Sequence, residues 1–248
     1  MDENHLLTSL SLADQENRQI PSPPGIKPIY AVAMPEERSF DRWQESDRKA
    51  REFGYRAIGI GSEDSLERLM ESSEFAEAVN TEEARKAVRD FDLPKWLGER
   101  EKELELEGGE IPHGNWEDPE GPASPGLWFP FEDGVHLDPW WMGLVPAEEH
   151  WEIPLSLGYG NWNDCPDPLV HGALALHWER KFGANIVAIG SDTVEFLVQR
   201  PPKNRDEALT LAKEHYFYCT DIVEQGIGTI AALGASLIEN GTWSFWWD

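Results

Sequence analysis

The sequence predicts an α/β fold (α+β in the broad sense), in which helices flank a mixed β-sheet. Residues 28–71 alternate strand and helix patterns in the order strand, helix, strand, helix. Residues 167–247 follow the order helix, β-hairpin, helix, helix, strand. A chain of 248 residues with 40% hydrophobic residues is also long enough to bury a substantial core. This order of elements allows the two halves of the chain to share one sheet.

The clearest element is a β-hairpin over residues 184–199. An apolar run at Ala184–Ile189 and an alternating run at Thr193–Gln199 flank a turn of Gly, Ser and Asp. The first run is apolar at nearly every position, which predicts burial on both faces. The alternation in the second run places Glu195 on the face opposite its apolar residues.

Composition divides the chain into four parts. Residues 1–27 are expected to form a flexible N-terminal tail that ends in the proline-rich stretch Pro21–Gly25. Residues 28–107 are expected to form the N-terminal βαβα half. We expect residues 108–142 to form an acidic connecting loop rich in Trp, Pro and Gly, and residues 143–248 to form the C-terminal domain.

The N-terminal half begins with a strand at Pro28–Met34 and a helix at about Glu37–Phe53. A second strand follows at Tyr55–Ile60, and Ser62 is placed to cap the next helix. Two strands joined by a crossover helix commonly form a parallel pair. The remaining helices predicted for this half are Glu63–Glu71, Thr81–Asp92 and Lys95–Glu107.

The glycines after the second strand, Gly59-Ile60-Gly61, invite comparison with a nucleotide-binding turn. The third glycine of that fingerprint is missing, because Asp64 occupies its position. Glu63 and Asp64 would also repel a phosphate at the start of the following helix. The sequence therefore argues against a nucleotide site here.

Side-chain caps mark the helix starts of the C-terminal part. Asp167, Asn204 and Asp221 each precede a helical pattern, and Gly183 follows the first of these helices. The elements expected in this part are a strand at Met142–Val145, helices at Pro168–Phe182, Asn204–Tyr218 and Ile222–Ile238, and a final strand at Trp243–Trp247.

The net charge of −26 is the strongest compositional signal. It argues against nucleic acid as a ligand, because phosphate binding requires Lys and Arg. No apolar run approaches the roughly 20 residues that a membrane span needs, and the N-terminus lacks the pattern of a signal peptide. The two Cys do not form a disulfide framework. We therefore expect a cytoplasmic protein whose partner is neither nucleic acid nor membrane.

Half of the charge excess lies in residues 99–153, which carry 15 acidic residues against 2 basic ones. One explanation is a solvated surface that keeps the protein soluble, and the other is an acidic face for a basic protein partner. The tryptophans in this region are costly to leave in water, so they either pack on the body or line a partner site. The candidates are Trp116, Trp128, Trp140 and Trp141.

Cys165, His215 and Cys219 are the one set of residues that suits metal or nucleophile chemistry. His215 and Cys219 are four residues apart on a predicted helix, so their side chains share one face. With Asp164 or His171 as a fourth ligand, the set would suit zinc. The alternatives are a core role, a Cys–His nucleophile pair and a disulfide. The neighbouring residues on that helix face are apolar, which favours the core role.

The loop formed by Asn161, Trp162, Asn163 and Asp164 is the best candidate for a binding loop. It precedes a predicted helix N-terminus, where backbone N–H groups can face a ligand. The alternative is a structural turn whose side chains cap neighbouring backbone groups.

A series of short blocks in a fixed order characterises the second half. The blocks include Gly160–Pro166, Ser191-Asp192-Thr193, Arg200-Pro201-Pro202, Glu214-His215, Gln225-Gly226 and Trp243–Asp248. This series resembles the bacterial DUF4253 family, a domain of unknown function, over roughly residues 143–248. Where members of that family often have Cys-Pro-Asp, this chain has Cys219-Thr220-Asp221. The resemblance implies one bacterial-type domain and supplies no activity.

No hydrolase triad, phosphate-binding loop or zinc-protease motif is present in the sequence. The sequence therefore favours a non-enzymatic module that binds a macromolecule, of an immunity-like or regulatory kind, with a protein as its partner. The alternative is a metal-binding protein or an enzyme that uses Cys165, His215 and Cys219. No cofactor is expected under the first hypothesis, and zinc is the metal expected under the second.

Overall fold

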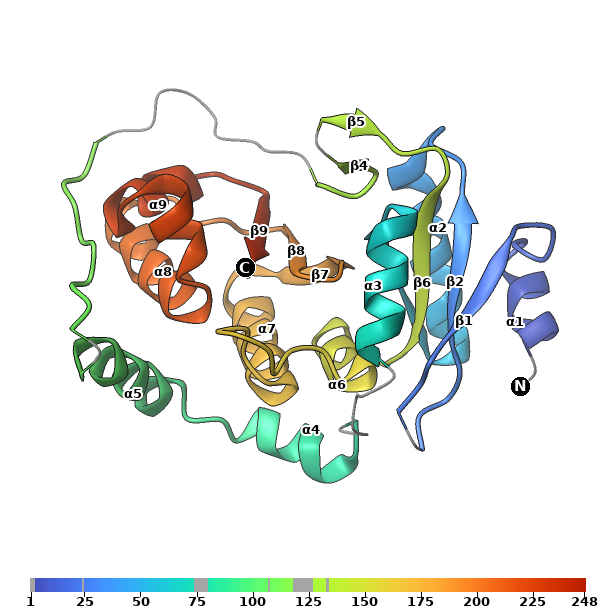
Figure 1. The fold of residues 1–248 in the computed structure, drawn as a ribbon, viewed down its shortest axis with the longest axis horizontal. Coiled ribbons are helices and arrows are strands. Elements are labelled where there is room, and N and C mark those ends of the chain that lie inside the picture. Colours follow the sequence, from blue (N-terminus) through green and yellow to red (C-terminus); the bar gives the residue numbers. More distant parts are fainter. Residues whose placement is uncertain (1–2, 24, 74–79, 107, 118–126, 133) are drawn as a thin grey trace.

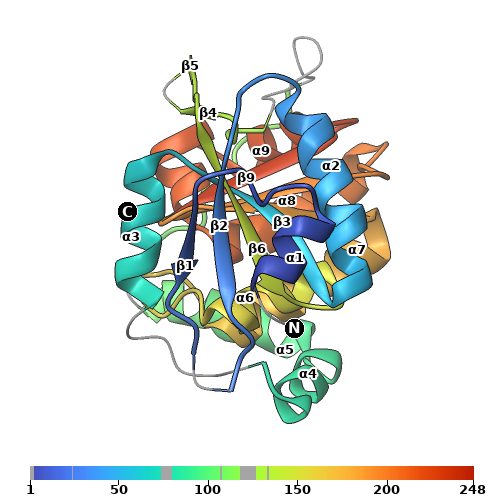
Figure 2. The same cartoon turned by 90° about the vertical axis from the view of Figure 1, so that its right-hand side faces the viewer.

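Strands from both halves of the chain form one mixed β-sheet of seven strands (Figure 1, Figure 2). The computed structural model describes residues 3–23, 25–73, 80–106, 108–117, 127–132 and 134–248. The strands lie in the order β1 (Asn17–Ile20), β2 (Ile29–Met34), β6 (Trp140–Pro146), β3 (Tyr55–Gly61), β7 (Ala184–Ile189), β8 (Thr193–Val198) and β9 (Thr242–Trp246). A separate two-stranded sheet contains β4 (Phe131–Glu132) and β5 (Val135–His136). This architecture confirms the predicted α/β class.

Helices cover both faces of the seven-stranded sheet, and α1 and α3 lie on opposite sides of β6 (Figure 1). The core of one face includes side chains from α1 (Glu3–Ser9) and α2 (Ser39–Ala50). The core of the other face includes side chains from α3 (Glu63–Ser73), α4 (Glu82–Arg89), α5 (Leu93–Leu106), α6 (Ile153–Leu157), α7 (Pro168–Phe182), α8 (Arg205–Tyr218) and α9 (Ile230–Leu237). Short helical turns at η1 (Arg51–Phe53), η2 (His150–Glu152) and η3 (Ile222–Ile227) complete the described helices.

Strand β6 joins the two predicted halves. It lies between β2 and β3 and runs antiparallel to both. The expectation that β2 and β3 pair directly is therefore wrong, because these parallel strands are separated by β6. All seven residues of β6 are buried, as a central strand requires. The predicted boundary between residues 142 and 143 thus falls inside a strand that both halves share.

The predicted hairpin is confirmed as β7 and β8, which pair in antiparallel orientation. Strand β7 also pairs in parallel with β3, where Ala188 lies opposite Gly59. Strand β9 adds to β8 at the edge of the sheet. The hairpin therefore connects the C-terminal elements to the N-terminal half.

The described residues before 28 do not form the expected flexible tail. Helix α1 buries Leu6 and Leu7 against the sheet, and β1 pairs with β2 in antiparallel orientation. A helix of this length is unstable in isolation, so tertiary burial stabilises it. Burial of each leucine contributes roughly 1.5–3 kcal/mol, which is why this segment packs.

The expected helix Ile222–Ile238 consists of two segments. Helix η3 has a non-helical backbone at Gly226, and α9 begins after Thr229, whose hydroxyl accepts the Ala232 N–H at 3.1 Å. Glycine lowers helix propensity by about 1 kcal/mol, so the glycines of this stretch favour the break. Asp221 does not cap the helix, because its carboxylate accepts the backbone N–H of Asp248 at 3.0 Å.

Candidate functional site

A pocket of about 290 Å³ lies at the carboxyl ends of the parallel neighbours β3 and β7. We call it the strand-end pocket. It is lined by residues of the β3–α3 turn, of segment 128–132 and of the β7–β8 hairpin. Ligands of open α/β sheets bind outside the carboxyl ends of parallel strands, so this position marks the pocket as the candidate site.

The turn from β3 into α3 forms one side of the pocket. Gly61 has a φ of +107°, and a Cβ at this position would collide with the carboxylate of Glu132. That carboxylate accepts the Ser62 N–H at 2.8 Å, and the Ser62 hydroxyl accepts the Ser65 N–H at 3.2 Å. The prediction that Ser62 caps this helix is confirmed. The Glu132 carboxylate thus occupies the start of α3, where a nucleotide phosphate would otherwise bind. This agrees with the absence of the third glycine of the nucleotide-binding motif.

Residues 127–132, which we call the strap, form the opposite wall. Glu195 on β8 accepts the backbone N–H groups of Trp128 and Phe129, the latter at 3.4 Å. The Phe129 side chain is buried, with its ring centroid 5.3 Å from that of Trp140. The strap is therefore held by one carboxyl group and one buried ring.

Glu195 has the most unusual environment among the acidic groups of the pocket. The alternation in β8 correctly places it opposite the apolar residues, but the strap covers it and leaves it only 2% exposed. Burial raises the pKa of Glu195 to about 7, although the hydrogen bonds from Trp128 and Phe129 act in the opposite direction. Glu195 therefore exchanges a proton near neutral pH. Sequence reasoning missed it, because its cover lies 66 positions earlier in the chain.

Charge in the strand-end pocket is mainly negative. Asp64, Glu132 and Asp192 line it together with Glu195. Among the described residues, Arg68 is the one cation in the lining. Such a site attracts a positively charged group.

Exposed apolar side chains lie on the strap and on the β4–β5 hairpin that continues it. Trp128 is 48% exposed, Phe131 36% and Val135 63%. Trp128 and Phe131 also line the pocket. Large apolar groups gathered beside a pocket mark an interaction surface, and exposed aromatic rings add the capacity to bind a cation.

The four tryptophans predicted to bind a partner lie in different environments. Trp128 lines the pocket. Trp140 and Trp141 are 0% and 1% exposed, so their predicted role as binding residues is corrected. They occupy the interior strand β6, all of whose residues are buried. Trp116 lies beneath the Arg205 guanidinium at 5.2 Å and packs on the body.

The loop Asn161–Asp164 is a turn that contacts the C-terminal residues. The Asn163 amide donates to the Asp248 carbonyl at 2.8 Å. The Trp162 ring meets the Trp247 ring edge-on, with centroids 6.4 Å apart. None of the four loop residues lines the strand-end pocket. These contacts favour the structural alternative over the binding loop.

Cys165 and Cys219 contact different polar partners. The Cys165 thiol lies 3.4 Å from His171 Nε2, and the Cys219 thiol donates to the Trp246 carbonyl at 2.8 Å. Both cysteines are free and buried. In the part of the chain that the structure describes, no group of three or more His, Cys, Asp or Glu side chains is arranged to hold a metal ion.

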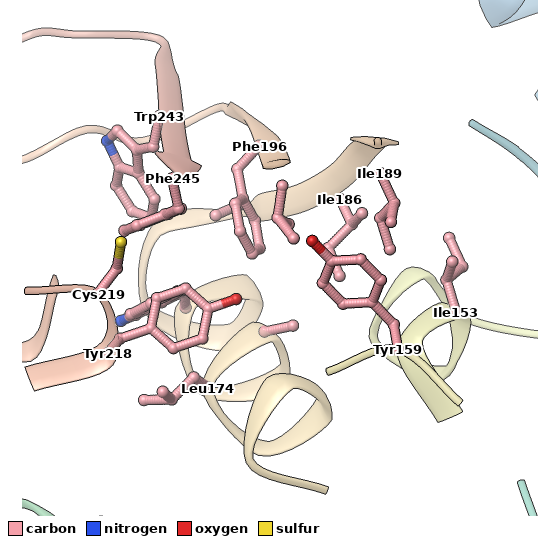
Figure 3. Close-up of a cluster of buried hydrophobic side chains, with 14 of the residues drawn as sticks. Ile153, Tyr159, Leu174, Ile186, Ile189, Phe196, Tyr218, Cys219, Trp243 and Phe245 are labelled. Carbon is pink, nitrogen blue, oxygen red and sulfur yellow. The ribbon is translucent and has the colours of Figure 1, made fainter. Parts of the chain in front are cut away.

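Burial suppresses the reactivity of these residues. It raises the pKa of the Cys165 thiol far above its ordinary value and that of Cys219 to about 12. It lowers the pKa of both His171 and His215 to about 3. Cys219 lies in the aromatic cluster with Tyr218, Trp243 and Phe245 (Figure 3). Protonated thiols beside neutral imidazoles do not form a nucleophile pair, so the geometry favours the core role.

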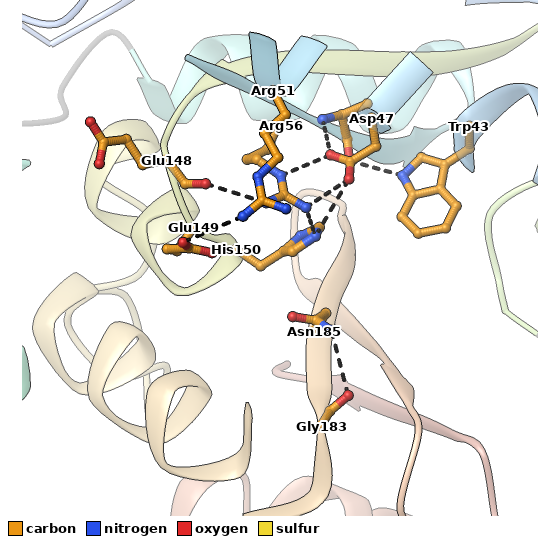
Figure 4. A network of polar contacts seen from close by, with 10 residues as sticks. Trp43, Asp47, Arg51, Arg56, Glu148, Glu149, His150, Gly183 and Asn185 are labelled. Carbon is orange, nitrogen blue, oxygen red and sulfur yellow. Dashed lines mark hydrogen bonds and ion pairs between the residues drawn. The ribbon is translucent and has the colours of Figure 1, made fainter. Parts of the chain in front are cut away.

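A second polar cluster ties α2 to β3 and η2 (Figure 4). The Arg56 guanidinium donates to both carboxylate oxygens of Asp47, at 2.9 and 2.7 Å, and also contacts His150 Nε2. Burial by itself would raise the pKa of Asp47, but its bonds with His150 and Arg56 outweigh this effect and hold that pKa well below its ordinary value. The charges of Arg56 and Asp47 compensate each other, and their hydrogen bonds hold α2 on the sheet. The cluster lies beside an open groove of about 880 Å³.

Residues 141–248 match the family model of the domain of unknown function DUF4253. This match confirms the resemblance seen in the sequence. The matched residues include Asp192 and Glu195, whereas Asp64, Arg68 and Trp128 lie outside the match. The pocket therefore combines this region with residues that precede it.

No curated protein and no solved structure matches this chain significantly. Within the described ranges, no helix has the length and apolar character needed to cross a membrane.

Proposed function

We propose that this protein is a non-enzymatic module, of an immunity-like or regulatory kind, that binds a protein partner. A basic side chain of that partner enters the strand-end pocket. The observation that carries this proposal is that carboxylates and exposed aromatic rings line the same pocket, the strand-end pocket. Carboxylates attract an ammonium or guanidinium group, and a ring face adds about 0.5–2 kcal/mol through cation–π attraction.

The overall charge supports the same kind of partner. A net charge of −26 attracts a basic protein over long range and speeds its encounter. The exposed Trp128, Phe131 and Val135 provide apolar contact area beside the pocket, which a protein partner can cover. The two free thiols support a reducing compartment such as the cytoplasm as the setting.

Peptide binding tests the proposal. A fluorescently labelled peptide rich in Lys and Arg and an acidic peptide of equal length are titrated with the protein, and anisotropy is measured. The basic peptide is expected to bind and the acidic one not to bind. Trp128→Ala is expected to weaken binding about tenfold, which corresponds to about 1.4 kcal/mol. The double variant Asp64→Asn/Asp192→Asn is expected to weaken binding and to reduce its salt dependence.

A charge-matched control separates the pocket from general attraction. Glu101→Gln/Glu105→Gln removes two exposed carboxylates from α5, away from the pocket lining. This variant is expected to retain nearly the affinity of the wild type. Equal losses in both double variants would show that the pocket is not the binding site. If the basic peptide does not bind the wild type, the proposed function is wrong.

A further inference from the structure

The strap and Glu195 hold each other in place. The N–H of Trp128 donates to one oxygen of the Glu195 carboxyl group and the N–H of Phe129 to the other. The Phe129 ring covers Gly59, where a Cβ would overlap the ring. The strap therefore supplies a hydrogen-bond donor to each oxygen of the Glu195 carboxyl group, which is 2% exposed in this arrangement.

The groups packed around Glu195 do not neutralise its charge. Glu195 pairs with Ala188 on β7 and with Ser244 on β9, and neither side chain is charged. On the helix side, α2 contributes the indole of Trp43 to the same core. No described cation forms an ion pair with Glu195. The charged groups that line the pocket with it are Asp64 and Arg68 on α3, Glu132 on β4 and Asp192 in the β7–β8 turn.

We propose that Glu195 is a positioning residue, whose carboxyl group holds the strap against β8 and, by binding or releasing one proton, shifts the strap between a closed and an opened position. In the closed position the carboxyl group is dry, so the protonated form is favoured there. In the opened position it meets water and releases its proton to the solvent as an ordinary carboxylic acid does. Acid therefore favours closure and base favours opening.

The size of the effect follows from the two environments of the carboxyl group. Burial raises the pKa of Glu195 from 4.5 to about 7 in the closed position. The ratio of closed to opened molecules then falls by up to about 300-fold in total as the pH rises from well below 4.5 to well above 7. This step rests on the proposed function, because the strap carries Trp128, a wall of the proposed binding pocket. Opening removes that wall, so the affinity for a basic peptide is expected to weaken as pH rises through 7.

The strap can be observed without any ligand. The protein is labelled with 5-fluorotryptophan, and the ¹⁹F resonance of Trp128 is identified by its loss in Trp128→Phe. In the wild type, this resonance is expected to shift between about pH 5.5 and 8.5, with a midpoint near the pKa of Glu195. In Glu195→Gln, which cannot ionise, it is expected to stay constant across that range.

Glu152→Gln is the matched control. Glu152 is also a buried carboxyl group, accepts the Glu148 N–H at 3.2 Å, and has a pKa raised by burial, but it does not line the strand-end pocket. The control is expected to retain the wild-type titration of Trp128. A titration that persists in Glu195→Gln, or a wild-type resonance that does not change with pH, would overturn the inference.

A second measurement requires no substitution at Glu195. Amide hydrogen exchange at Trp128 and Phe129 of the wild type, corrected for the intrinsic effect of pH, is expected to lose protection as pH rises through 7. Constant protection would overturn the inference. If the strap titrates but no basic peptide binds, the inference holds and the proposed function fails. If the peptide binds with an affinity independent of pH and the strap does not respond, the proposed function holds and the inference fails.

Discussion

The aromatic cluster around His215 and the strand-end pocket both bury titratable groups, but the consequences differ. His215 lies among the rings of Trp178, Trp243 and Phe245, with centroids 4.7–4.9 Å away, and its pKa is lowered to about 3. Glu195 is covered by the strap, and its pKa is raised to about 7. The first group does not change its charge near neutral pH, whereas the second does. Burial disfavours the charged form of both groups, which moves the pKa of the histidine away from neutral pH and the pKa of the glutamic acid toward it.

The two regions also respond to acid in opposite directions. An unfolded histidine binds a proton below about pH 6.5, but the folded protein keeps His171 and His215 neutral. These groups therefore reduce stability as pH falls below that value. Glu195 retains a proton in the fold between pH 4.5 and about 7, where the unfolded chain has lost it. This group therefore increases stability as pH falls through that window.

Truncation at the centre of the aromatic cluster is expected to have the largest effect. Trp178 is fully buried, stacks on Phe245 at 5.6 Å and donates its indole N–H to Glu214 at 2.9 Å. Trp178→Ala is expected to lower the free energy of unfolding by about 3–5 kcal/mol, as measured by urea denaturation. Trp128→Ala, at a side chain that is 48% exposed, is expected to cost less than about 1 kcal/mol. Equal losses would contradict the distinction between the two regions.

The next effect concerns the stability of Glu195→Gln. Ionisation of the buried carboxyl group destabilises the wild type as pH rises, and glutamine does not ionise. The stability of the variant relative to the wild type is therefore expected to rise by about 3 kcal/mol between about pH 4.5 and 7.5. Denaturation curves of both proteins over this range measure the difference. Parallel stability profiles would show that Glu195 is ionised without cost in the fold.

An effect that grows only at acidic pH is expected for His215→Leu. Leucine has a similar volume and cannot bind a proton, so the variant lacks the acid-induced loss that His215 contributes. Its stability relative to the wild type is expected to increase by about 1.4 kcal/mol for each pH unit below 6.5. Thermal unfolding at several acidic pH values measures this trend. A difference that does not vary with pH would show that His215 is accessible to protons in the fold.

The smallest expected signal is thiol reactivity in the native protein. Both thiols are buried with a raised pKa, so a disulfide reagent is expected to label neither Cys165 nor Cys219 until the protein unfolds. Labelling followed by absorbance, with and without denaturant, measures the reactive thiols. Rapid labelling of the native protein would return the Cys–His hypothesis to consideration.

Patterns within a few residues gave correct predictions for most elements. The hairpin of β7 and β8 and the helix capped by Asp167 agree with their predicted positions. Predictions failed where a distant segment decides the environment. Trp140 and Trp141 lie in a region of acidic and turn-forming residues, yet the sheet places them in an interior strand. The prediction for the residues before 28 failed for the same reason, since the burial of α1 against a face of the sheet stabilises this helix.

The sequence by itself determined the α/β class, the hairpin, the acidic character and the resemblance to DUF4253, because each depends on composition or on neighbours along the chain. Only the tertiary structure decided that β6 lies between β2 and β3 and that the strap covers Glu195. These features depend on contacts between residues far apart in the chain, where packing and the loss of water set the free energy. For this reason the alternation in β8 predicted the face of Glu195 but not its burial or its raised pKa.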